Sequence, residues 1–140
     1  MVRSYCVDGT NLVRSGGYGG PQFREQEDAD TRRLVAALGE LCRRLEGQAE
    51  VEVFFDGAAR AVGAAGPGLT VRFSHETAAD ELILDRVRSR PYAGGGKVTV
   101  VTGDGELGRL AEEEGGTWLR VSPGAPLESV LSRIERRFNK

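Results

Sequence analysis

Four aspartates lie at or near the ends of predicted strands, where carboxylates can take part in chemistry. Asp8 ends the first apolar run, Asp56 follows VEVFF, Asp104 follows VTVVT, and Asp80 lies just inside a predicted helix. The carboxyl ends of parallel strands meet at one rim of a sheet, and ligands bind there at the point where strand order reverses. We therefore expect the four carboxylates to gather at one rim, with Asp8 and Asp104 flanking the crevice and Asp80 facing it.

Crowded carboxylates raise one another's pKa and need a cation to stay ionised. Oxygen ligands without a supporting His or Cys favour Mg²⁺ or Mn²⁺ over zinc. Such an ion lowers the pKa of a bound water and directs it at phosphorus, and a second ion about 3.5–4 Å away stabilises the leaving oxygen. Asn11, three residues after Asp8, is placed to orient that water or a ligand carboxylate. This chemistry favours phosphodiester hydrolysis.

Each aspartate also has a purely structural explanation. Asp8 and Asp56 suit turns as Asp-Gly pairs, Asp104 suits the cap of the following helix, and Asp80 lies three residues after Thr77 as in a capping box. The joint occurrence of the four at one rim favours a site. We also expect Asp80 to continue the row that faces the sheet, which consists of Ile83, Leu84 and Val87.

Two other motifs compete with this interpretation. GDGELG has the glycine spacing of a dinucleotide-binding turn, but Asp104 would press negative charge against a pyrophosphate. CVDGT resembles the first motif of haloacid-dehalogenase phosphatases, but Cys6 stands where their nucleophilic aspartate belongs. A phosphatase acting on small substrates is therefore a third, less favoured function.

Length, charge and cysteine content limit the class of protein. A chain of 140 residues has the size of one domain, so we predict a single domain over 1–140. The net charge of −2 gives no general attraction for nucleic acid, so any site for a polyanion must be formed by a local group of positive side chains. Cys6 and Cys42 lack metal-ligand spacing and are predicted to be buried thiols. Without a long apolar run or signal-like start, we expect a cytoplasmic protein that binds no membrane.

Arginines supply the local positive charge that a nucleic acid needs. Solvated side chains are the default interpretation. Cationic side chains around an acidic pocket would nevertheless hold a nucleic-acid backbone while metal ions take the scissile phosphate. The candidates in or beside the rim loops are Arg14, Arg24, Arg60 and Arg72.

Short apolar runs alternate with longer segments of helical period, which predicts an α/β fold with a mostly parallel five-stranded sheet flanked by helices. The expected strands are 2–7, 51–55, 69–73, 97–102 and 117–121. The expected helices are 27–46, 78–89, 105–114 and 127–138. Two segments rich in Gly, Ala and Pro, 15–22 and 57–68, are expected to be mobile loops at the rim.

Four segments carry a resemblance to a known family. VDGTNLV, VEVFFDG, TAADELIL and VTVVTGDGELGRLA occur in the order seen in NYN domains, and the chain resembles the YacP-like branch of these PIN-like nucleases from residue 2 to 121. The resemblance implies a PIN-like three-layer sandwich and a metal-dependent endoribonuclease. Its partner would be single-stranded or messenger RNA, in some relatives in the context of the ribosome.

The resemblance also implies roles for individual residues. By position, Asp8, Asp80 and Asp104 are the catalytic, metal-binding acids, Asn11 supports them, and Asp56 is a more peripheral acid. Gly103 stands where the family often has serine, so a hydroxyl that would support the neighbouring aspartate is missing. The alternative function is an RNA- or ribosome-binding module that keeps the acids only as structure. The sequence predicts no oligomeric state.

Overall fold

Five strands form one parallel sheet in the order β3-β2-β1-β4-β5. The computed structural model describes residues 2–14, 23–91 and 96–138. The predicted α/β fold with five strands is confirmed, and the sheet is parallel throughout. Its strands are β1 (Arg3–Asp8), β2 (Ala49–Phe55), β3 (Leu69–Phe73), β4 (Val98–Thr102) and β5 (Thr117–Arg120).

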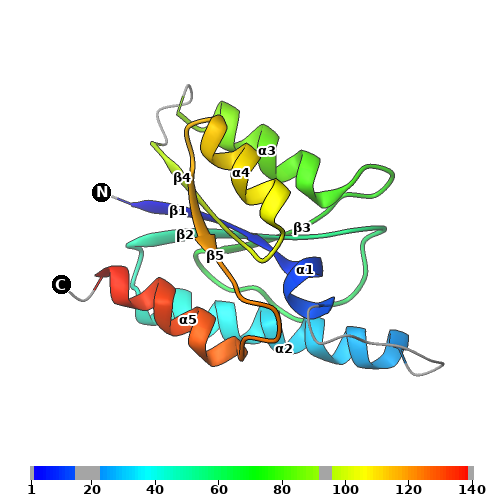
Figure 1. Ribbon diagram of the computed structural model, residues 1–140. Coiled ribbons are helices and arrows are strands. Elements are labelled where there is room, and N and C mark those ends of the chain that lie inside the picture. The colour runs from blue at the N-terminus through cyan, green and yellow to red at the C-terminus, as the bar shows by residue number, and fades with distance from the viewer. Residues whose placement is uncertain (1, 15–22, 92–95, 139–140) are drawn as a thin grey trace.

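Helices cover both faces of this sheet. Figure 1 shows α3 and α4 over one face and α2 with α5 over the other, so that the fold has three layers. The helices are α1 (Gly9–Arg14), α2 (Phe23–Arg44), α3 (Ala79–Ser89), α4 (Gly105–Glu113) and α5 (Leu127–Glu135), followed by a short 3₁₀ turn η1 (Arg136–Phe138). In the part of the chain that the structure describes, none of the helices has the length and apolarity to cross a membrane.

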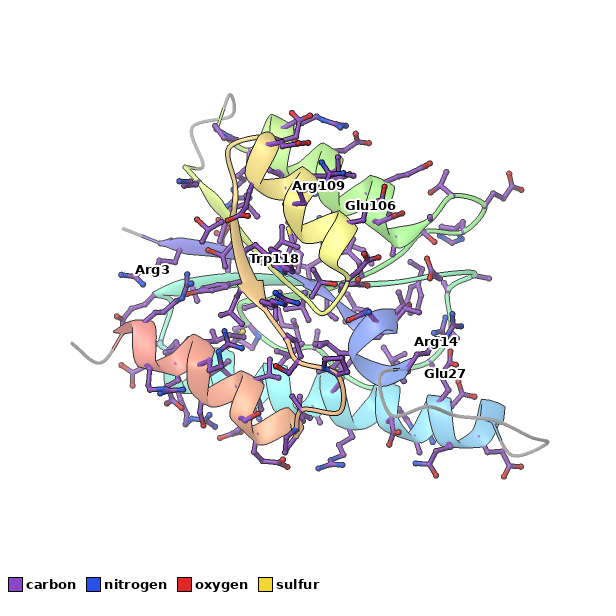
Figure 2. All side chains as sticks on the ribbon, viewed as in Figure 1. Arg3, Arg14, Glu27, Glu106, Arg109 and Trp118 are labelled. Atoms are coloured by element: carbon purple, nitrogen blue, oxygen red, sulfur yellow. The ribbon has the colours of Figure 1, made fainter. Side chains whose placement is uncertain are left out.

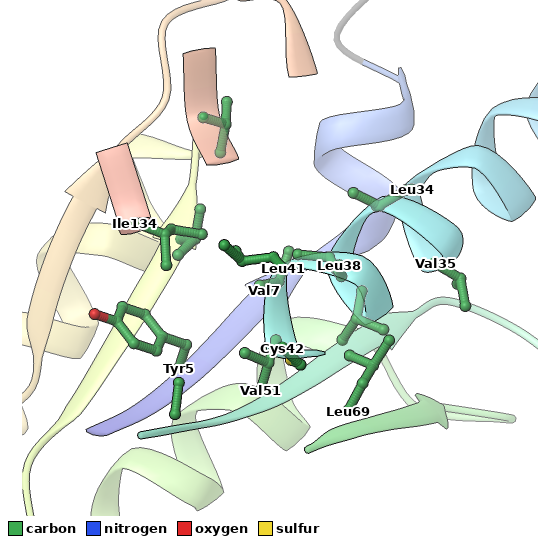
Figure 3. Packing of buried hydrophobic residues seen from close by; sticks show 14 of the residues in the cluster. Tyr5, Val7, Leu34, Val35, Leu38, Leu41, Cys42, Val51, Leu69 and Ile134 are labelled. Atoms are coloured by element: carbon green, nitrogen blue, oxygen red, sulfur yellow. The ribbon is translucent and has the colours of Figure 1, made fainter. Parts of the chain in front are cut away.

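The central strand β1 is buried on both faces, because its side chains alternate between the two helical layers. Tyr5 and Val7 pack with α2 and α5, whereas Cys6 packs with α3 and α4. Figure 3 shows the larger cluster, in which α2 lays one apolar row against β1 and β2. Cys6 and Cys42 are both buried and free, as predicted.

The helix α1 was not expected from the sequence. It has only six residues, too few for a helical period to show. Gly9 lets the chain turn directly from β1 into α1, because a Cβ at this position would lie 2.4 Å from Cε1 of Phe55. The helix α2 begins at Phe23 instead of residue 27. The predicted loop 57–68 lacks helix and strand, while the segment 15–22 lies outside the described residues.

Candidate active site

Three predicted site acids lie at the edge of the sheet where the strands end. Asp8 is the last residue of β1, Asp56 follows β2 directly, and Asp104 follows β4 by two residues. The three strands are parallel neighbours, so their carboxyl ends meet here. The strand order reverses between β1 and β4, which is the usual ligand position in an open α/β sheet. We call Asp8, Asp56 and Asp104 the acidic edge.

Asp8 is the buried member of the acidic edge, with 7% of its surface exposed. Its Oδ2 accepts a hydrogen bond from the Thr102 hydroxyl at 2.9 Å, and its Oδ1 lies 3.4 Å from the backbone nitrogen of Asn11. Burial raises the pKa of Asp8 to about 6; the two hydrogen bonds oppose this rise, and the charges of Asp56 and Asp104 add to it. No cationic side chain among the described residues contributes to this balance. Within the described residues, the carboxylate is therefore held in place without an ion-pair partner.

Thr102 connects two members of the acidic edge, and sequence reasoning missed it. Its hydroxyl donates to Asp8 and accepts from the backbone N–H of Asp104 at 3.0 Å. The residue is fully buried, so it acts only through its neighbours. The available signal was a hydroxyl residue at the end of an otherwise apolar strand, directly before Gly103 and Asp104.

Asn11 fastens the loop between β4 and α4. Its Oδ1 accepts the backbone N–H of Gly103 at 2.8 Å, so its carbonyl oxygen is occupied by the protein. Gly103 has no room for a side chain, because a Cβ would lie 2.8 Å from the carbonyl oxygen of Val121 and 3.1 Å from Asn11 Oδ1. The hydroxyl that supports Asp104 comes from Thr102, one position before the glycine.

Asp104 caps the helix α4 as well as belonging to the acidic edge. Its Oδ1 accepts the backbone N–H groups of Glu106 at 3.0 Å and Leu107 at 3.2 Å. An N-cap oxygen satisfies amides that have no partner inside the helix. Asp104 thus caps the helix, as its structural explanation predicted, and it uses the Oδ1 oxygen for this. Its charge still reaches Asp8, whose pKa it helps to raise.

Asp56 caps a helix that is distant in sequence. Its Oδ1 accepts the backbone N–H of Ala79 at 2.8 Å, and its own N–H donates to the hydroxyl of Thr10 at 2.8 Å. Thr10 is buried and was also missed at the sequence level. The capping box that was one structural alternative for Thr77 and Asp80 does not form, because the Thr77 hydroxyl donates to the carbonyl oxygen of Ser74 instead.

Asp80 lies exposed in the first turn of α3. The buried row of this helix consists of Ala79, Ile83 and Val87. The expectation that Asp80 continues the sheet-facing row is therefore wrong, because the actual row begins one residue earlier. Asp80 follows the amide that Asp56 binds, which places its backbone beside the acidic edge. The structure does not bury its carboxylate with that of Asp8.

The donor chemistry of the acidic edge fits a hard divalent cation. Among residues 2–14, 23–91 and 96–138, no three or more His, Cys, Asp or Glu side chains are already arranged to hold an ion. Mg²⁺ needs no such cage, since it is usually held by one or two carboxylates and keeps several waters. Asp8 and Asp104, joined through Thr102, supply that number of carboxylates.

Two of the predicted RNA-binding arginines lie beside the acidic edge. Arg14 forms two hydrogen bonds with Glu27, at 3.1 and 3.2 Å (Figure 2), and this pair raises its pKa. Arg60 donates to the carbonyl oxygen of Asp56 at 3.2 Å. Arg72 forms an ion pair with Glu52, and Glu52 also pairs with Arg86 of α3. The Arg72 side chain is thus directed to the helical layer that contains α3. The side chain of Arg24 lies outside the described residues.

The competing motifs gain no support from these contacts. Burial, with a smaller contribution from Glu52, raises the pKa of Cys6 to about 12, so this thiol is no nucleophile at neutral pH. The amides at the start of α4, where a pyrophosphate would bind, are occupied by Asp104. Neither a phosphoenzyme nor a dinucleotide site is favoured.

Comparison with known proteins gives one result that bears on the fold. No family model and no curated protein matches the chain. A solved structure, the W164L mutant of Rae1 (YacP) from Bacillus subtilis, superposes on this chain with a TM-score of 0.66. The superposition covers 99% of this chain and 80% of the Rae1 chain. The chain has a YacP-like fold. At 20% identity, this likeness shows the architecture alone, and the chemistry of the acidic edge has to be argued from the residues of this chain.

Proposed function

We propose that the chain is a metal-dependent endoribonuclease that hydrolyses RNA phosphodiester bonds at the acidic edge. The observation that carries the proposal is Asp8, a buried carboxylate at the reversal of strand order with no cationic partner among the described residues. Burying a charge without compensation is costly, so such a group is retained where a ligand compensates it. RNA as the substrate comes from the family resemblance of the sequence.

In this proposal Asp8 and Asp104 hold the ion, with Asp80 as the third acid. Mg²⁺ or Mn²⁺, when bound, activates a water and neutralises charge on the phosphate. Thr102 keeps the Asp8 carboxylate in one orientation and fixes the backbone of Asp104. Asn11 holds the loop that carries Asp104.

The cationic groups beside the acidic edge position the RNA strand. Arg60 lies over the ring of Phe73, with 5.2 Å between its guanidinium carbon and the ring centroid. It also binds the backbone of Asp56. Arg14 is held by Glu27 and remains exposed. Both guanidinium groups can donate hydrogen bonds to a phosphate, and messenger RNA on the ribosome is one form of the strand that we propose.

The second candidate is an RNA- or ribosome-binding module without catalysis. It is favoured by the capping contacts, because Asp56 and Asp104 each have a structural task at a helix start. The two candidates differ in whether Asp8 is needed for a reaction or is only tolerated in the fold.

A cleavage assay separates the two candidates. The parent protein, Asp8→Asn and the control Glu112→Gln are incubated with end-labelled single-stranded RNA and Mn²⁺, with EDTA as the blank. Glu112 is exposed near the far end of α4. We expect cleavage by the parent and the control and at least about a hundredfold loss in Asp8→Asn, as is usual when a group acting on the transition state is removed. If the parent protein binds RNA but shows no metal-dependent cleavage, the result supports the RNA- or ribosome-binding module.

A further inference from the structure

Asp56 joins the two chain segments that carry Asp8 and Asp80. Its backbone N–H donates to the Thr10 hydroxyl at 2.8 Å, and its Oδ1 accepts the N–H of Ala79, also at 2.8 Å. Thr10 lies two residues after Asp8, and Ala79 directly precedes Asp80. One residue at the end of β2 thus fixes the start of α1 and the start of α3 relative to each other.

The start of α3 depends on Asp56 because its own cap position offers no acceptor. The N-cap residue is Ala78, which has no side-chain hydrogen bond. Thr77, the nearest hydroxyl, is turned to the carbonyl oxygen of Ser74. The first amides of a helix have no partner within it and need an acceptor from elsewhere. The Asp56 carboxylate supplies this acceptor to the Ala79 amide. Its negative charge also interacts favourably with the positive end of the helix dipole.

The backbone around Asp56 is fastened on several sides. Gly57 donates to the hydroxyl of Ser74 at 3.1 Å, and His75 donates to the carbonyl oxygen of Gly57 at 2.8 Å. Arg60 donates to the carbonyl oxygen of Asp56 at 3.2 Å. With its backbone fixed and one carboxylate oxygen bound to an amide, the side chain is built to hold α3 in place.

We propose that Asp56 is a positioning residue, which binds no metal itself and holds the first turn of α3, and with it the backbone of Asp80, beside the segment that carries Asp8, so that Asp80 can reach a cation bound there. The inference rests on the proposed function, because holding Asp80 there matters only if Asp80 and Asp8 share a ligand. It assigns Asp56 a role different from that of a peripheral acid of the metal site.

The test compares two substitutions at Asp56. Asp56→Asn keeps an oxygen that can accept the Ala79 amide but removes the charge, whereas Asp56→Ala removes both. We expect Mn²⁺-dependent RNA cleavage by the asparagine variant within about threefold of the parent, and a loss of about 10–100-fold in the alanine variant, as is typical for residues that support metal ligands. Amide exchange at Ala79 should quicken by roughly fivefold in the alanine variant alone, as expected for a lost helix cap. Glu81→Ala, an exposed acid in the same turn, is the control and should match the parent.

Two outcomes overturn the positioning role. Equal, large losses in both variants mean that the charge is needed and that Asp56 is a metal ligand. Parent-like cleavage by Asp56→Ala, despite faster exchange at Ala79, means that the cap has no bearing on the site. If the alanine variant does not fold, the asparagine variant decides alone, since retention supports positioning and loss supports ligation.

Failure of the proposed function is recognised separately. If the parent cleaves no RNA, the endoribonuclease proposal fails whatever the variants do. Mn²⁺ affinity, measured by calorimetry on the parent and both Asp56 variants, then takes the place of cleavage. A parent-like dissociation constant in Asp56→Asn with a weaker one in Asp56→Ala supports the positioning role, and any other pattern, including no binding by the parent, overturns it.

Discussion

Replacing Asp8 with asparagine is expected to stabilise the metal-free protein at neutral pH. The native pKa of Asp8 is about 6, against an ordinary value of 3.8. At roughly 1.4 kcal/mol per pKa unit, the ionised carboxylate lowers the free energy of unfolding by about 3 kcal/mol. Asparagine avoids this cost, but it cannot accept hydrogen bonds from both Thr102 and Asn11 as a carboxylate does, which costs about 1–2 kcal/mol. We therefore expect a net gain of about 1–2 kcal/mol at pH 8.

The gain should disappear in acid, because the effect comes from ionisation. A carboxyl group whose pKa is raised on folding binds its proton more tightly in the native state. Its destabilising effect is complete above the native pKa, falls as the pH drops through about 6, and ends below 3.8, where both states are protonated. The asparagine variant should then be no more stable than the parent.

Urea unfolding at pH 8 and pH 3.5, with EDTA present, measures both values. Glu76→Gln is the matched control, since Glu76 is exposed outside the helices and strands, and its effect should stay within about 0.5 kcal/mol at each pH. A variant that is less stable than the parent at pH 8 by more than about 1 kcal/mol would refute the reasoning. So would a difference of the same size at both pH values. The first result would mean that the Asp8 carboxylate is a stabilising contact of the fold, and the second that the effect of the substitution does not come from ionisation.

Three further predictions follow from the same contacts. Gly103→Ser should lower the free energy of unfolding by about 1–3 kcal/mol, because its Cβ meets a backbone carbonyl oxygen at 2.8 Å; unchanged urea unfolding would contradict this. Gly108→Ala should cost a similar amount, since its Cβ would lie 2.0 Å from Cε2 of Trp118, whereas Gly105→Ala in the same helix meets nothing within 4 Å and should cost nothing. At a subsaturating Mn²⁺ concentration, RNA cleavage should decline as the pH falls through about 6, because the proton that Asp8 takes up in the metal-free protein competes with the ion; an apparent Mn²⁺ affinity that is the same at pH 8 and pH 5 would contradict this.

The sheet could be predicted from the sequence because its signals are local. Each strand is a short apolar run, and the helices between them carry apolar rows such as the one that α2 lays on β1. The helix α1 was missed because six residues are shorter than two turns. The order of the strands also fixed which loops meet, so the shared edge of Asp8 and Asp104 followed from topology.

The details of the acidic edge could not be predicted in the same way. Asp56 caps α3 across 23 positions of sequence, and Thr102 reaches Asp8 across 94. Such bonds depend on side-chain directions that only tertiary packing decides. The position of Asp80 depended on the phase of one helix, and a shift by one residue moved it from the sheet-facing row to the surface.

The single tryptophan of the chain is connected to the acidic edge through Thr102 by two hydrogen bonds. The indole Nε1 of Trp118 donates to the carbonyl oxygen of Thr102 at 3.0 Å, and the hydroxyl of this threonine binds Asp8. Indole emission responds to hydrogen bonding and to nearby charge. We expect the emission of Trp118 to change when a ligand binds at Asp8, so that titrations with Mg²⁺ or RNA could be followed without attaching a dye.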